Sequence, residues 1–262
     1  MQIMSLGQSG FLLEGSQTIV CDPFLGHLED PAERKKFPRL IEADIGVRRL
    51  GSPAVVFVSH HHGDHCHTET LKAIADTSPA AMFVAPKSAA DRMIDRGIAP
   101  ERIICPFLPE WQSEAGIRFF PVPAAHYAFS HRADAIFDYW GYVIELDQHR
   151  LFHAGDTILY NGMLDILQKL QITVAFLPIN GRNWRREAMG IVGNLNEYES
   201  AFLCQAIDCK LVVPCHFEMF AENTGNVGEF LNHLRQLVPD AKAWVPSFGA
   251  IWEVPPVLSG RI

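Results

Sequence analysis

The stretch AVVFVSHHHGDHCH occupies residues 54–67 and joins an apolar run to a cluster of histidines. Its first five residues, 54–58, are typical of a short strand buried on both faces of a sheet. Residues 59–67 contain five histidines. Because α/β proteins often place ligand sites where a strand ends, we expect this cluster to lie at the mouth of a sheet.

The spacing within the cluster indicates a metal site. His60 and His62 lie two residues apart, so their side chains point the same way in an extended segment. The chain can then turn at Gly63, which lets Asp64 and His65 face a second point. Imidazole and carboxylate groups are suitable ligands for Zn, Mn, Fe or Ni.

A catalytic metal needs more ligands than this cluster provides, since it usually has about three protein ligands and a water. Three further candidates follow predicted strands: His126 follows FFPVPAA, Asp156 follows RLFHAG, and His216 follows KLVVPC. A single histidine is usually a surface or packed residue. Ligand-type residues at four strand ends favour a metal site instead. The candidate ligands are His60, His62, Asp64, His65, His126, Asp156 and His216.

The rest of the chain predicts one α/β domain over residues 1–262, with two packed sheets and helices outside them. Short strands are expected at 2–6, 10–15, 18–24, 54–58, 81–85, 102–107, 117–124, 139–146, 150–155, 172–179, 210–215, 242–247 and 249–254. Helices are expected at 68–77, 87–97, 160–170, 196–208 and 227–238. Residues 23–52 are polar and are expected to form a solvated loop, with a lid or an oligomer contact as the alternatives.

Composition limits the partners. The formal net charge of −8 argues against long nucleic acid and anionic membranes. No segment is long and apolar enough to span a bilayer, and the first residues lack the pattern of a signal peptide. The six cysteines form no CxxC pair, so we expect buried, reduced thiols. These features favour a cytoplasmic protein with a small-molecule substrate, and we expect a homo-oligomer.

The motifs HHHGDH, PAAH, HAGDT and VPCH together resemble those of the metallo-β-lactamase superfamily. The resemblance implies an αββα sandwich with two divalent metal ions at the edge of the sheets. It also implies that His60, His62 and His126 hold one ion, and that Asp64, His65 and His216 hold the other. Asp156 would bridge the two.

Further segments are similar to the L-ascorbate-6-phosphate lactonase-like branch: DPFL at 22–25, LPINGR at 177–182, IVGNLNEYES at 191–200 and VPCHFEMF at 213–220. This resemblance implies a hydrolase that opens a sugar lactone, often phosphorylated, with Mn²⁺ or Zn²⁺. Two metals would lower the pKa of a shared water, and Asp64 and Asp156 would position it and move its proton. A phosphodiesterase acting on small or cyclic nucleotides is the alternative.

Other residues are candidates for supporting roles. In NGRNWRR, Asn180 and Arg182 could bind an anionic substrate, because a guanidinium binds phosphate through paired hydrogen bonds. His131 could also touch substrate. His153 could orient Asp156 through a hydrogen bond, with plain packing on its strand as the alternative. We expect His61 and His67 to be exposed or to support the ligands, Cys66 and Cys215 to be buried thiols, and GQSG at 7–10 to be a turn.

Overall fold

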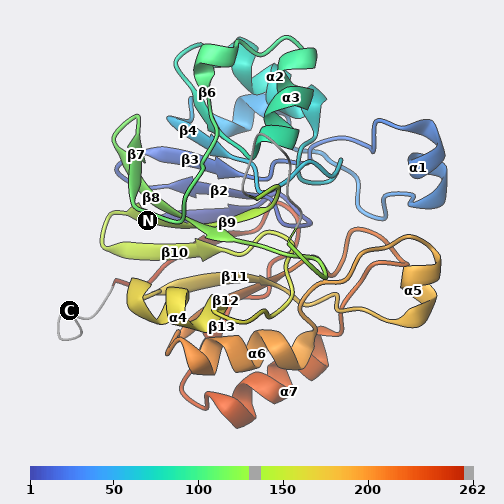
Figure 1. Cartoon of the computed structure of the whole chain (residues 1–262), viewed down its shortest axis with the longest axis vertical. Helices are drawn as coiled ribbons and strands as arrows, with labels where there is room; N and C mark the ends of the chain where they lie inside the picture. The colour runs from blue at the N-terminus through green and yellow to red at the C-terminus, as the bar shows by residue number, and fades with distance from the viewer. Residues whose placement is uncertain (130–136, 257–262) are drawn as a thin grey trace.

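The computed structural model describes residues 1–129 and 137–256, which form two seven-stranded sheets packed face to face (Figure 1). The strand order in one sheet is β14-β1-β2-β3-β4-β5-β6, and in the other it is β13-β12-β11-β10-β9-β8-β7. Both sheets contain parallel and antiparallel pairs. The prediction of two mixed sheets flanked by helices is confirmed.

The strands of the first sheet are β1 (Gln2–Ser5), β2 (Phe11–Glu14), β3 (Thr18–Cys21), β4 (Val55–Phe57), β5 (Met82–Val84), β6 (Ile103–Ile104) and β14 (Ile251–Glu253). Those of the second are β7 (Gln112–Glu114), β8 (Ile117–Pro123), β9 (Trp140–Leu146), β10 (His149–His153), β11 (Val174–Pro178), β12 (Leu211–Cys215) and β13 (Lys242–Ala243). Helices α2 (Thr68–Thr77) and α3 (Lys87–Asp95) cover the first sheet, while α4 (Met163–Leu167), α6 (Glu197–Ala206) and α7 (Val227–Leu237) cover the second (Figure 1).

Successive side chains along each strand point to opposite faces of its sheet. This alternation produces three apolar layers, one between the sheets and one between each sheet and its helices. In β4, Val55 and Phe57 face the second sheet, whereas Val56 packs under α2 and α3. In β11, Phe176 faces the first sheet and Leu177 packs under α6 and α7. Strands buried on both faces need apolar residues at every position, which explains why these two runs lack polar residues.

Helix α2 begins where the histidine cluster ends. His67 is its N-cap: the ring nitrogen Nδ1 accepts a hydrogen bond from the Thr70 amide, and the side chain is buried. Of the two alternatives predicted for His67, exposure is therefore wrong, while a role in supporting the ligands stays a prediction. The apolar face of α2 places Leu71 and Ile74 against the first sheet.

Two short helices were not predicted, and both project from the same side of the molecule (Figure 1). Helix α1 (Pro31–Lys36) lies in the segment predicted to be a loop, and α5 (Trp184–Ala188) follows β11. Neither helix contains a buried residue, so neither leaves an apolar period in the sequence. Asp30 and Asn183 cap them instead.

Other differences are smaller. The predicted helix 160–170 is α4 followed by a 3₁₀ turn, Gln168–Leu170, and β7 was not predicted. Five of the six cysteines are buried as expected, but Cys105 is exposed. Among the described residues, no helix has the length and apolar character needed to cross a bilayer.

The layer between the sheets should dominate stability. Phe176 is 2% exposed and its ring centroid lies 4.5 Å from that of Phe11 across the interface. We expect Phe176→Ala to lower the free energy of unfolding by about 3–5 kcal/mol, because it leaves a cavity between two rigid sheets. Urea unfolding measures this, with Trp184→Ala, whose side chain is 80% exposed, as the matched aromatic control. Equal effects in the two variants would contradict the prediction.

Candidate metal centre

The candidate ligands lie beyond the carboxyl ends of four strands from both sheets. His60, His62, Asp64 and His65 follow β4 of the first sheet. From the second sheet, His126 follows β8, Asp156 follows β10 and His216 follows β12. All seven meet at one edge of the sandwich, as the sequence predicted.

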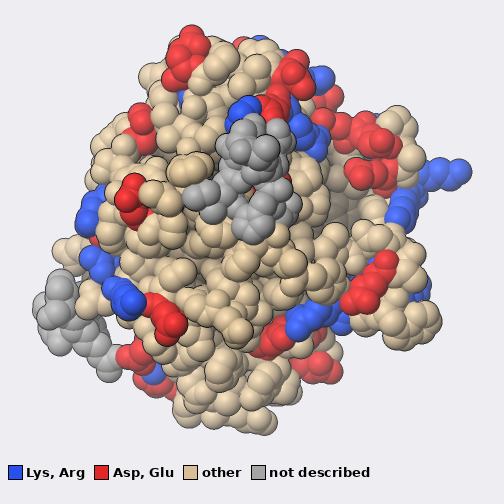
Figure 2. All heavy atoms as spheres, in the orientation of Figure 1, with Lys and Arg blue, Asp and Glu red and all other residues tan. Residues whose placement is uncertain are grey.

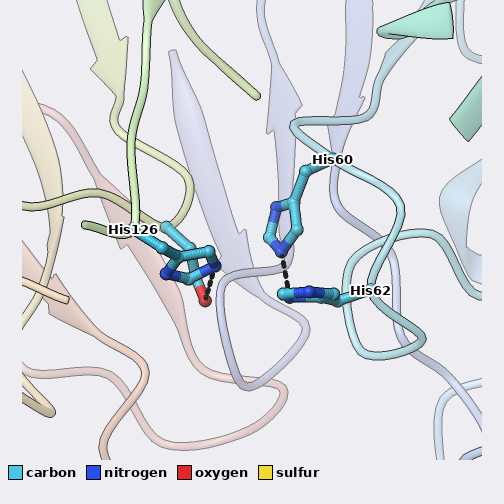
Figure 3. A group of neighbouring side chains, drawn as sticks. His60, His62 and His126 are labelled. Carbon is cyan, nitrogen blue, oxygen red and sulfur yellow. Dashed lines mark hydrogen bonds and ion pairs between the residues drawn. The ribbon is translucent and has the colours of Figure 1, made fainter. Parts of the chain in front are cut away.

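One group combines His60, His62, His126 and Asp156, whose ligand atoms all lie within 4.8 Å of one another. His60 Nε2 lies 2.9 Å from His62 Nδ1, and the ring of His126 stacks against that of His62 at 5.2 Å (Figure 3). His126 reaches the pair from the opposite sheet (Figure 3). The HxH spacing therefore directs both imidazoles toward the same candidate metal position.

A second group combines Asp64, His65 and His216. Asp64 Oδ2 lies 3.7 Å from His65 Nε2 and 3.6 Å from His216 Nε2. Asp156 lies between the groups. Its Oδ1 is 3.2 Å from His65 Nε2 and 3.4 Å from His216 Nε2, while its Oδ2 is 3.8 Å from His126 Nε2.

The residues fit metal ions because three of their inward-facing atoms make no hydrogen bond within the described part of the chain. His65 Nε2, His126 Nε2 and Asp156 Oδ1 are buried and make no hydrogen bond among the described residues. The other nitrogen of each ring is bonded: His126 Nδ1 donates to the Gly193 carbonyl at 2.9 Å, and His65 Nδ1 donates to Asp22 at 2.8 Å. With Nδ1 bonded, Nε2 of each ring faces the site. Burial alone would lower the pKa of His65, but Asp156, Asp64 and Asp22 outweigh it and raise that pKa, so a bound ion would displace a proton from His65 Nε2.

Burial also keeps three histidines neutral. Burial, reinforced by His126, lowers the pKa of His62 to about 3. Burial and the neighbouring histidines lower the pKa of His60, and burial lowers that of His126. Neutral imidazole is the form that binds a metal, so these side chains are ready to act as ligands near neutral pH.

Asp22 is a functional residue that sequence analysis missed, although it opens the DPFL motif. Its carboxylate is fully buried and accepts hydrogen bonds from the Ser59 amide (2.7 Å), the Ser59 hydroxyl (2.6 Å), His65 (2.8 Å) and His153 (2.8 Å). Burial alone would raise the pKa of Asp22, but His153 and His65 outweigh it and lower that pKa well below its usual range. The prediction that His153 orients Asp156 is wrong, because its Nε2 binds Asp22.

Gln8 is a second missed residue, in the turn between β1 and β2. Its Nε2 donates to Asp64 Oδ2 at 2.7 Å and lies 3.1 Å from His216 Nε2. Its backbone carbonyl accepts from the His216 amide at 2.9 Å. Gln8 and His216 have φ of 53° and 61°, so both occupy the left-handed region that non-glycine residues rarely adopt. GQSG is a turn, as predicted, but it also supports the second group of ligands.

Two of the three predicted substrate contacts, Asn180 and Arg182, lie outside the cavity lining. Arg182 pairs with Glu199 through both guanidinium ends, at 2.8 Å and 2.6 Å. Asn180 is 2% exposed and bonds to Asn194 and Asn223. Neither side chain lines the cavity over the metal centre. His131 lies outside the described residues.

A cavity of about 330 Å³ opens over the ligands. His62, Asp64, His126, Asp156 and His216 form its floor. His61 lines it too, while Cys66 and Cys215 are buried thiols, as predicted. Arg92 from α3 also lines the cavity and was not predicted, since its sequence context is an ordinary helix.

We expect Asp22→Asn to weaken metal binding about 10–100-fold, because an amide NH₂ facing His65 favours the tautomer with a proton on Nε2. Asn tolerates the left-handed φ of 39° at this position, so the fold should persist. Calorimetric titration of the metal-free protein with Zn²⁺ measures the affinity. Asp147→Asn is the matched control, since Asp147 is exposed and has a φ of 54°. Unchanged affinity in Asp22→Asn would refute the positioning role.

Gln8→Asn should weaken binding of one metal equivalent about 10-fold while sparing the other, because the shorter amide no longer reaches Asp64. The same titration, analysed for two equivalents, measures this. Gln171→Asn is the control, because Gln171 is exposed and has a φ of 51°. Equal weakening of both equivalents would argue against a role confined to the second group.

Comparison with known proteins agrees with this geometry. Residues 17–217 match the family described as the β-lactamase superfamily domain. A UPF0173 metal-dependent hydrolase of Methanoculleus marisnigri is 28% identical over 236 residues, covering 88% of this chain and 87% of the relative. One from Thermococcus onnurineus is also 28% identical, over 231 residues, covering 87% of this chain and 90% of the relative.

Solved structures share the fold. The metallo hydrolase Igni18 of Ignicoccus hospitalis superposes with a TM-score of 0.72 at 19% identity, covering 97% of this chain and 99% of that one. An isothiocyanate hydrolase from Delia radicum gut bacteria gives a TM-score of 0.74 at 17% identity, with the same coverage. At such identities the similarity concerns the fold alone. The family match extends from β3 to the residue after His216 and includes every candidate ligand, so the chain belongs to the β-lactamase superfamily domain family.

Proposed function

We propose that this protein is a metal-dependent hydrolase that opens a small lactone or ester. The observation that carries the proposal is the convergence of seven ligand-type side chains, five of which line one cavity. Three of their inward-facing atoms make no hydrogen bond among the described residues. Relatives described as metal-dependent hydrolases support the reaction class. The lactone substrate rests on the sequence resemblance to the lactonase branch and stays a prediction.

We assign the ligands in two sets. His60, His62 and His126 would hold one divalent ion, and Asp64, His65 and His216 would hold the other. Asp156 would contact both, since its two oxygens face different sets. The nitrogen and oxygen ligands suit Mn²⁺ or Zn²⁺. Divalent ions bound here would supply hydroxide near neutral pH by lowering the pKa of water.

The chain's own groups would then manage orientation and protons. The Asp64 side chain is 16% exposed and borders the cavity, whereas that of Asp156 is 7% exposed. Asp64 is therefore the carboxylate better placed to accept a proton from the attacking water and pass it to the leaving alkoxide oxygen. Asp156 would hold the water between the two ligand sets.

The phosphate part of the predicted substrate is a separate question. The sequence predicted that Arg182 binds the phosphate group, but the Arg182 guanidinium forms an ion pair with Glu199. A small-molecule substrate and a homo-oligomeric assembly also stay predictions. The present proposal therefore covers lactones in general, and its test includes phosphorylated and unphosphorylated compounds.

The test uses protein stripped of metal and reloaded with Mn²⁺ or Zn²⁺, assayed on γ-lactones, on a sugar lactone with and without a 6-phosphate, and on bis-p-nitrophenyl phosphate. We expect metal-dependent opening of lactones. His62→Ala should abolish it because one ligand set loses its second imidazole, while the circular dichroism spectrum stays unchanged.

The matched control is His233→Ala, on α7 and outside the cavity lining, which should retain activity. Turnover of the phosphodiester without any lactone would replace the proposal with a phosphodiesterase. Full activity in His62→Ala would refute the ligand assignment.

A further inference from the structure

We infer that the cavity selects a substrate with an apolar acyl group, because apolar side chains from two projecting segments face each other above the ligand floor. This inference rests on the proposed function, since it takes the ligand floor as the place of reaction. It differs from the anionic sugar substrate that the sequence resemblance suggests.

One wall comes from the segment around α1 and from the loop after β12. Leu28, Phe37 and Phe220 line the cavity on this side. They belong to a separate apolar cluster with Phe24 and Met219, and the Phe37 and Phe220 rings meet edge to face at 6.5 Å. Leu28 and Phe220 are 7% and 4% exposed, so the wall is backed by packed side chains and is already formed.

The facing wall comes from the segment after α5. Ile191 and Val192 line the cavity there. The Ile191 amide donates to the Arg186 carbonyl at 2.9 Å, which fixes this segment against α5. The Lys36 ammonium donates a hydrogen bond to the Met189 carbonyl, which connects α1 to the segment after α5. The apolar surfaces are therefore held in place on both sides.

Charge argues against a phosphorylated substrate. Among the described lining residues, Arg92 is the sole lysine or arginine. Its guanidinium donates to the His61 carbonyl and lies 3.6 Å from Glu29. Glu33 adds a negative charge to the same rim. The basic residues of α1 are exposed. Figure 2 shows basic side chains projecting outward at that edge of the molecule.

The combination of floor and walls defines the substrate class. The ligand floor would take the carbonyl, and the walls would take an alkyl chain or ring attached to it. Burial of each methylene group is worth about 0.8 kcal/mol, which is about fourfold in affinity. A polyhydroxylated chain gains less there, because hydroxyl groups laid against Phe37, Ile191 and Val192 would find no hydrogen-bond partner on those side chains.

The experiment measures binding without turnover. Hydroxamates chelate divalent metals through the same head group. Differences in affinity among them therefore measure how the attached chain interacts with the cavity walls. Calorimetry on the Zn²⁺-loaded protein should show affinity rising about fourfold per methylene from acetohydroxamate through butyro- to hexanohydroxamate. Gluconohydroxamate, with the same six carbons but five hydroxyl groups, should bind more weakly than hexanohydroxamate.

Phe37→Ser and Val192→Ser should flatten this dependence to less than about twofold per methylene, because each removes apolar surface from one wall. Both residues are partly exposed, and acetohydroxamate affinity shows whether the metal floor stays intact. Trp184→Ser is the control, since its side chain is 80% exposed and lies outside the cavity lining. This variant should keep the fourfold dependence.

The outcomes separate this inference from the proposed function. Affinity that is independent of chain length, or tighter binding of gluconohydroxamate, would overturn the inference even if lactones are hydrolysed. A chain-length dependence without turnover of any lactone would support the apolar selection and would remove the lactonase proposal. Unchanged dependence in both wall variants would show that the chain binds elsewhere.

Discussion

The metal centre depends on a carboxylate that is buried between the two sheets. A lone buried charge is very costly, and Asp22 is stabilised because four donors surround it. Two come from Ser59, immediately before the histidine cluster, one from His65 and one from His153 on β10. The same hydrogen bonds that make the buried charge tolerable also join the two sheets and fix the tautomer of His65. Stability of the core and orientation of a ligand therefore have a common cause.

Three residues at this edge have a strained backbone. Asp22, Gln8 and His216 all have positive φ, and each contacts a candidate ligand or is one. Such conformations persist only where the surroundings hold them, as the hydrogen bond between the Gln8 carbonyl and the His216 amide does. The strain is offset by packed strands on both sides. This arrangement lets a chain turn sharply at the end of a buried strand and still direct an imidazole inward.

How far the sequence predicts the structure depends on the range of the interactions. The candidate ligands could be picked out because each follows an apolar strand. The spacing of His60 and His62 is a local pattern that spans only three residues. Helix α2 could be found from its apolar period. Gln8, Asp22 and Arg92 could not, because their roles arise from contacts with residues far along the chain. His153 was recognised as a supporting residue but was given the wrong partner for the same reason. Helices α1 and α5 bury no residue, so no apolar period indicates them. Arg182 forms an ion pair with Glu199, and no local sequence pattern predicts that pair.

The two parts of the cavity are built in different ways, and this has a consequence for how specificity could change. The floor comes from strand ends in the packed core, where a substitution disturbs ligands, buried charge and sheet packing together. The walls come from segments carrying α1 and α5, whose own residues are exposed. Substitutions at the partly exposed wall residues Phe37 and Val192 cost little stability, since few buried contacts are lost. A chain with this design can keep one reaction centre unchanged while the wall residues change which acyl group reaches it.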